Sequence, residues 1–142
     1  MLSKTIKFED WDGVEREEVH YFNLSESELM EMEMSTPGGF ANSMQAMIRM
    51  KDAPKLMATF KMLILKSYGE KSADGRRFVK SEGLSREFSQ TPAYDQLFME
   101  LVTDADKASA FVNGIVPKKL AEKAQSSEVQ EQLKNHPALK MK

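Results

Sequence analysis

An amphipathic stretch at residues 91–102 limits the possible folds more than any other feature of the sequence. Its apolar side chains recur at i, i+3, i+4, i+7 and i+8, the spacing of a helix that lies with one face on a core. Thr91 and Pro92 precede the stripe in the order expected of an N-cap and a first helical turn. The stretch therefore predicts a core-packed helix whose buried face carries Tyr94, Leu97, Phe98, Leu101 and Val102.

Other segments carry similar helix signals, each bounded by a capping residue, a proline or a glycine. Their apolar side chains recur at helical spacing, so each has one face suited to burial. The predicted segments are a short helix that begins at the Ser25–Glu28 capping box and breaks at 35–39, and helices over 40–51, from 53–54 to Gly69, over 83–89, and from Asp104 to Pro117.

The first 22 residues predict a β-hairpin. Ile6 and Phe8 alternate with polar residues, as in a half-buried strand, and residues 10–13 supply turn chemistry. In the return strand, residues 14–22, Val14 falls on the opposite face from Val19, so either a bulge intervenes or the alternation is imperfect. We expect the hairpin to bury one face against helices 53–68 and 92–102, through Ile6, Phe8, Val19 and Tyr21.

These elements predict an α+β fold that is mainly α-helical, with an N-terminal β-hairpin packed on a bundle of five or six short helices. The 142 residues suffice for one ordinary domain. Residues 1–117 hold all the predicted elements and form a single domain. Residues 118–142 lack aromatic side chains and are poor in large apolar ones, so a polar, basic and mobile tail is expected there.

Composition narrows the class of protein. The sequence has no cysteine, which excludes disulfides, thiolate zinc sites and a cysteine nucleophile. No apolar run approaches the roughly 20 residues that span a bilayer, and residues 1–4 do not lead into a signal-peptide core. The net charge of −2 predicts no nucleic-acid partner. We therefore expect a cytoplasmic domain with neither a membrane nor a nucleic acid as its partner.

Charge is distributed unevenly along the chain. Residues 1–34 carry a net charge of −7, residues 35–115 carry +2, and residues 116–142 carry +3. An acidic head and a basic tail can steer encounter with a partner or discourage random self-association. An ordinary solvated surface is the alternative interpretation, and the sequence leaves both open.

The search for chemically active residues yields no catalytic, cofactor-binding or metal-binding site. Neither His20 nor His136 has a neighbouring serine and acid of the kind that a general base needs. A helix places Glu26 and Glu28 about 200° apart, so they do not present one ligand face to a cation. Acidic residues at a helix start are already explained by capping and the helix dipole. We expect a protein without enzymatic activity.

A basic cluster at Arg76, Arg77 and Lys80 surrounds Phe78. Such a cluster could contact a phosphate backbone, and it is the basis for considering a nucleic-acid-binding regulator. Three charges are a weak electrostatic footprint, however, and a solvated turn is the better explanation.

Methionine is unusually frequent: the chain has eleven, and eight lie between Met30 and Met62. Unbranched, polarizable methionine side chains adapt to varied apolar partners. In segments 29–34 and 40–51 they exceed what one buried stripe accommodates, which indicates an exposed, adaptable groove for a partner helix. Filling of a small helical core is the alternative.

The sequence also resembles the tail assembly chaperones of long-tailed bacteriophages and prophages. The resemblance covers roughly residues 4–117 in consistent order and includes no catalytic motif. It rests on YFNL (21–24), ELMEME (28–33), ATFK (58–61), LKSYGEKS (65–72), DGRRF (74–78), FSQTPAY (88–94), FMEL (98–101), TDA (103–105) and AFVNGI (110–115).

This resemblance implies a chaperone that binds the tape-measure protein, keeps it soluble and assists tail-tube assembly without catalysis. Its partners would be the tape-measure protein and tail-tube subunits, with self-association also plausible. It would act in the host cytoplasm and be absent from the mature virion. The alternative is a structural tail-tube or connector component, which would show a larger sheet and occur in purified particles. For the chaperone, the hypothetical partner-binding residues are Met30, Met34, Met44, Met47 and Ile48.

Overall fold

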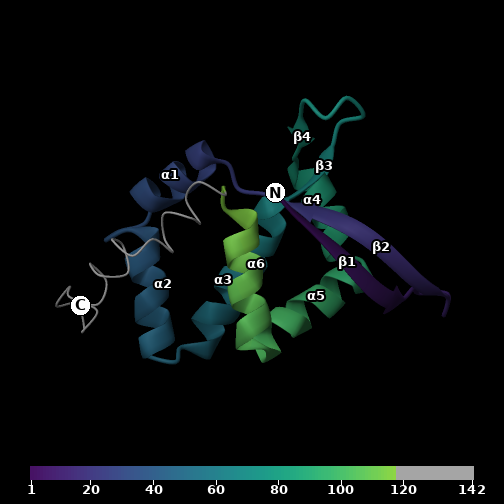
Figure 1. The fold of residues 1–142 in the computed structure, drawn as a ribbon. Coiled ribbons are helices and arrows are strands. Elements are labelled where there is room, and N and C mark those ends of the chain that lie inside the picture. Colours follow the sequence, from purple (N-terminus) through teal and green to yellow (C-terminus); the bar gives the residue numbers. More distant parts are fainter. Residues whose placement is uncertain (118–142) are drawn as a thin grey trace.

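A computed structural model describes residues 1–117 of the chain, except for the side chain of Ile48. The tail expected at 118–142 lies outside the described residues. The described chain forms ten elements (Figure 1): β1 (Leu2–Glu9), β2 (Glu15–Phe22), α1 (Glu26–Ser35), α2 (Phe40–Arg49), α3 (Ala53–Ser67), β3 (Tyr68–Lys71), β4 (Phe78–Val79), α4 (Glu82–Ser89), α5 (Pro92–Thr103) and α6 (Ala105–Ile115). The predicted class, α+β and mainly helical with an N-terminal hairpin, is confirmed.

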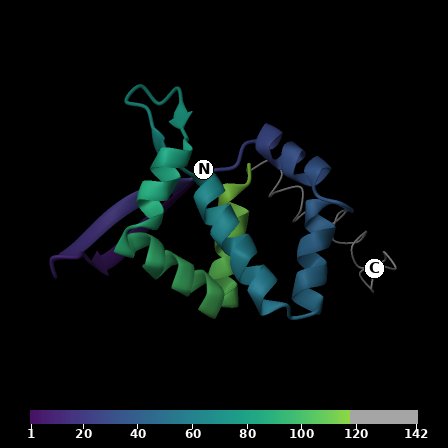
Figure 2. The same cartoon turned by 180° about the vertical axis from the view of Figure 1, so that it is seen from behind.

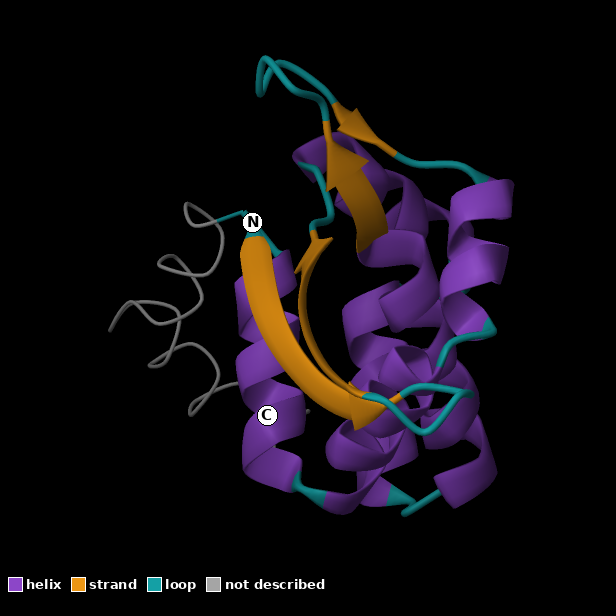
Figure 3. Cartoon of the chain, turned by 90° about the vertical axis from the view of Figure 1, so that its right-hand side faces the viewer, coloured by secondary structure: helices purple, strands orange, loops and turns teal. Residues whose placement is uncertain are grey.

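The four strands form one antiparallel sheet in the order β1-β2-β3-β4. β1 and β2 pair without interruption from Leu2 opposite Phe22 to Glu9 opposite Glu15. Only the end of β2, at Tyr21 and Phe22, pairs with β3. The long hairpin curves over the helices, while β3 and β4 form a separate short projection (Figure 3).

The hairpin buries a different face of β2 from the one predicted. Ile6 and Phe8 are buried as expected, but they lie opposite Glu18 and Arg16 in the register. Residues 16, 18, 20 and 22 therefore share their face, and Val19 projects from the other face with half of its surface exposed. Tyr21, also on that outer face, is only partly covered. The prediction was wrong for Val19 because the uninterrupted register places the even-numbered residues of β2 on the face of Ile6 and Phe8.

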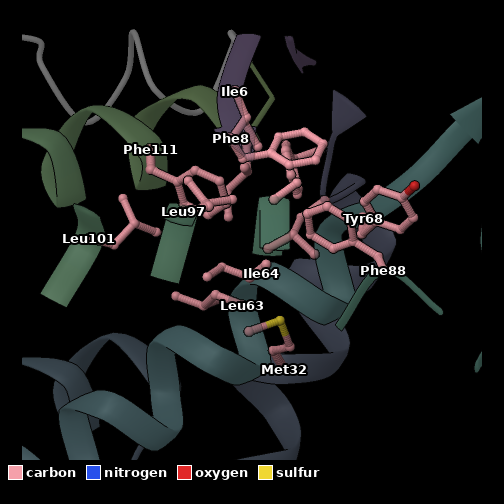
Figure 4. Close-up of a cluster of buried hydrophobic side chains, with 14 residues drawn as sticks. Ile6, Phe8, Met32, Leu63, Ile64, Tyr68, Phe88, Leu97, Leu101 and Phe111 are labelled. Carbon is pink, nitrogen blue, oxygen red and sulfur yellow. The ribbon is translucent and has the colours of Figure 1, made fainter. Parts of the chain in front are cut away.

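Aromatic side chains from four elements form the centre of the core (Figure 4). Phe22 of β2 is 0% exposed, and its ring lies edge-on to Tyr68, Phe88 and Phe111, with centroids 5.4–5.8 Å away. The rings of Tyr68 and Phe88 stack with centroids 4.2 Å apart. Edge-on and stacked pairs of this kind contribute beyond the area that they bury. They join β2, β3, α4 and α6.

Most helix starts follow the predicted caps. The capping box is complete, because Glu28 N donates to Ser25 Oγ and Ser25 N donates to Glu28 Oε1. The third helix, however, ends at Ser67 rather than at Gly69, which lies within strand β3. A Cβ at Gly69 would lie 2.8 Å from Val79 O and 2.7 Å from the Phe78 ring, so close strand approach requires glycine there.

Helices α1 and α2 form an arm, residues 26–49, at one side of the body made by the other elements (Figures 1 and 2). α2 packs on α1 and on α3. Met32 anchors the inner side of α1 in the core. A salt bridge also holds α1: Lys80 Nζ lies 2.7 and 2.9 Å from the Glu28 carboxylate oxygens. Lys80 Nζ also donates to Asn23 O.

Replacing Gly69 by alanine is expected to destabilise the fold by about 1–3 kcal/mol, the usual cost of overpacking. The added methyl group would collide with the backbone carbonyl of Val79. Urea denaturation followed by circular dichroism measures the change. Gly83→Ala is the control, since only Ser81 Oγ at 3.8 Å meets its Cβ, and helix propensity favours alanine there. Equal stability of both variants would contradict the close approach.

The salt bridge between Glu28 and Lys80 predicts a contribution to the free energy of unfolding that is lost in acid. Burial raises the pKa of Glu28, but hydrogen bonds from Lys80 and Ser25 lower the pKa by more than burial raises it. The pKa of Glu28 therefore lies below its ordinary value of 4.5. The stabilisation is therefore present above pH 4.5 and is lost as the pH falls through the lowered pKa of the folded state.

Glu28→Gln retains a capping-box side chain and removes only the charge. At neutral pH this variant is expected to be less stable than the wild type by up to about 1 kcal/mol. Urea titrations at a series of pH values should show this difference shrinking as the pH falls below 4.5 and Glu28 becomes protonated. A difference that stays constant over the whole acidic range would show that the charge of Glu28 contributes nothing.

Candidate functional site

An open apolar hollow of about 570 Å³ separates the arm from the body. We call it the methionine groove. Only two of its lining residues are charged, both on α1. The lining consists of Leu24, Glu26, Leu29, Met30, Glu33, Phe40, Ala41, Met44, Leu63, Val112, Ile115 and Val116.

Helix α1 supplies one wall through a single stripe of side chains. Glu26, Leu29, Met30 and Glu33 are spaced i, i+3, i+4 and i+7, so they lie on one face of the helix. The capping box at Ser25 fixes where α1 begins, and with it which residues face the groove. The wall is therefore apolar at its centre and acidic toward both ends.

The remaining walls and the floor are apolar. α2 contributes Phe40, Ala41 and Met44, while the end of α6 contributes Val112 and Ile115, followed by Val116. Leu24 and Leu63, 1% and 3% exposed, form part of the floor and belong to the main core. The groove is thus a lateral opening of the core itself.

A second hollow continues the apolar surface along α2. It lies between α2, α3 and the junction of α5 with α6, and Leu56, Phe60 and Leu101 help to line it. Met44 and Val112 line both hollows, so the two meet at these side chains. An elongated apolar ligand could contact both.

The five hypothetical partner-binding residues lie in different environments in the structure. Met30 is 64% exposed in the groove, and Met44 is half-buried between the two hollows. Met47 is half-buried against α3, where Thr59 Oγ1 donates to its sulfur at 3.5 Å. Met34 is 79% exposed but is not part of the groove lining. Ile48 belongs to α2, and its side chain lies outside the described part of the structure.

The methionines divide into core and exposed side chains, and their role in binding a partner helix stays a prediction. Met32 is 8% exposed and fills the core, whereas Met30, Met34, Met50 and Met57 expose between 47% and 79% of their surface. Sequence reasoning missed the groove residues outside segments 29–51. For Leu63, Val112 and Ile115 the only signal was membership of amphipathic stripes, which does not distinguish a groove wall from a core contact. Leu24, Glu26 and Val116 belonged to no such stripe.

The arm carries an excess of negative charge. α1 has four glutamates and no basic residue. Glu28 is paired with Lys80, and Glu33 Oε1 accepts a hydrogen bond from Ala41 N, at the start of α2. Glu26 sits in the first turn of α1, where the helix dipole favours a carboxylate. Glu26 and Glu28 diverge as predicted, because one lines the groove and the other faces Lys80.

The other chemically suggestive residues are not brought to the groove. His20 packs beside Phe88 and lies 3.0 Å from Glu18 Oε1. Arg76 and Arg77 are exposed on the β3–β4 connection, whereas Lys80 is engaged by Glu28, so the basic cluster is divided. Within residues 1–117, no group of three potential metal ligands comes together and no helix is long and apolar enough to cross a membrane. The groove offers apolar contact and two carboxylates.

A comparison with known protein families identifies a family that matches the chain. A family model described as phage tail assembly chaperone matches residues 1–142, the whole chain. No curated protein and no solved structure matches at a significant level.

Proposed function

The chain belongs to the phage tail assembly chaperone family, and from this premise we propose that it binds the tape-measure protein, keeps it soluble and assists tail-tube assembly. The protein acts by binding alone and catalyses no reaction. It works in the host cytoplasm and leaves before the virion is complete, and tail-tube subunits are a further candidate partner.

The observation that carries this proposal is the methionine groove. An assembly chaperone has to cover apolar surface on its client and release it later, which favours many modest contacts over a rigid socket. An amphipathic helix can lay its apolar face into such a groove. Met30 and Met44 provide side chains that adapt to different apolar partners.

The groove also suits reversible binding because of how it is built. Its floor, at Leu24 and Leu63, is buried in the core, whereas Met30 on its rim is mostly exposed. A client helix therefore finds a fixed apolar base and an adjustable edge. That Met47 and Ile48 contact the client stays a prediction, whereas Met34 lies outside the groove lining and this proposal does not place it against the client. The groove does not support the alternative, a structural tail-tube or connector component.

Met30→Glu and Met44→Glu are each expected to abolish rescue of the tape-measure protein. Either change places a carboxylate against an apolar client surface, where burying an unpaired charge is costly. The measurement is co-expression with the tape-measure protein, scoring its soluble fraction and its co-purification with the chaperone. We expect the co-purified amount to fall at least about tenfold, which corresponds to about 1.4 kcal/mol.

Met34→Glu is the matched comparison, because it makes the same change on the same helix outside the groove lining. It should rescue the client nearly as well as the wild type. Circular dichroism and thermal melting establish that all three variants are folded. Wild-type levels of rescue by folded Met30→Glu and Met44→Glu would place client binding elsewhere. Failure of the wild type itself to solubilise the client would overturn the proposed function.

A further inference from the structure

The arrangement of charge around the methionine groove points to a particular kind of client, and we propose that the groove selects an amphipathic helix with a basic flank whose Lys or Arg residues recur every seven positions. This inference rests on the proposed function and specifies the partner of the same site. It is carried by the geometry of α1 and by the contrast between the two walls.

The two groove-lining carboxylates are placed for a helical partner. Glu26 and Glu33 are seven residues apart, which is two turns of α1, or about 10.5 Å along its axis. Leu29 and Met30 lie between them on the same face. A helix that runs along α1 can place residues i and i+7 opposite the two glutamates, and its apolar stripe then meets Leu29 and Met30.

Both carboxylates can accept such a partner. Among residues 1–117, no Lys, Arg or His lies within 4.0 Å of either one, in contrast to Glu28, which Lys80 neutralises. Glu33 accepts from Ala41 N through Oε1 and packs Oε2 beside Gly39, but the residue is exposed and a cation can approach its carboxylate from the rim. Each carboxylate can therefore form an ion pair at the rim.

The opposite wall carries no matching charge. The end of α6 presents Val112, Ile115 and Val116 to the groove, and the described charges of α6, Asp106 and Lys107, lie in its first two turns. One flank of a bound helix thus meets carboxylates and the other meets apolar side chains. This asymmetry fixes how the client is rotated about its own axis, with the basic flank toward α1.

Three designed peptides test the inference with the full chain. Each peptide is a helix of about three heptads with the same stripe of Leu and Met residues. The three differ only at every seventh position of one flank, which is Lys in the first peptide, Gln in the second and Glu in the third. Fluorescence anisotropy at low salt measures their affinities for the wild type. The Lys peptide is expected to bind about three- to tenfold more tightly than the Gln peptide, and the Glu peptide more weakly than both. Salt should reduce these differences.

The double variant Glu26→Gln/Glu33→Gln should bind the three peptides with nearly equal affinity. The side-chain amide that replaces the carboxylate of Glu33 would still offer a carbonyl oxygen to Ala41 N, so the start of α2 keeps its cap. Glu31→Gln is the matched control, because Glu31 is exposed on α1 but is not among the groove-lining residues. It should keep the full preference for the Lys peptide.

Every other pattern overturns the inference: equal affinities for the wild type, a preference for the Glu peptide, loss of the preference in Glu31→Gln, or no binding of any peptide. A second copy of this chain in the groove would appear as a dimer in sedimentation that binds none of the peptides, which also counts against it. Solubility of the co-expressed tape-measure protein separates the two failures. If the wild type rescues it while the peptides show no charge preference, only this inference fails.

Discussion

Burial of Phe22 is the interaction on which the rest of the structure depends. Its ring, 0% exposed, lies against Tyr68, Phe88 and Phe111, so one side chain holds β2, β3, α4 and α6 together. The next two residues continue this attachment through the backbone, because Asn23 N donates to Ser67 O at 2.8 Å and Leu24 N donates to Ile115 O at 2.7 Å. The chain that leaves the sheet is thereby clamped between the ends of α3 and α6.

The position of the groove follows from this clamp. Leu24 becomes part of the groove floor, and Ser25 immediately starts α1 with its capping box. Lys80 binds both Asn23 O and Glu28, which fixes the direction in which α1 leaves the body. α2 then returns to α3 and leaves the apolar centre of the α1 wall and the apolar end of α6 on opposite sides of an opening. A groove of this kind keeps apolar surface uncovered, which in a folded domain indicates a binding surface.

The sequence determines the helices more clearly than their relative placement. Caps at Ser25 and Thr91 marked helix starts correctly, since capping depends on neighbouring residues. Val19 was assigned to the wrong face, because alternation shows that two faces exist but only the register with β1 shows which one is covered. Gly69 resembled a helix end, although it serves the approach of β3 to β4. The methionine excess pointed to Met30 and Met44, whereas Val112 and Ile115 join them only through long-range packing.

The central claim is that a pliable apolar groove between the arm and the body receives the client. The chain's own methionines report on it directly, because Met30 and Met44 line the groove whereas Met57 and Met99 are exposed without lining it. We suggest labelling the methionine methyl groups with ¹³C and recording their NMR signals while a soluble fragment of the tape-measure protein is added. The account predicts that the signals of Met30 and Met44 shift or broaden and that those of Met57 and Met99 stay in place. Changes confined to Met57 and Met99, with Met30 and Met44 unaffected, would contradict it.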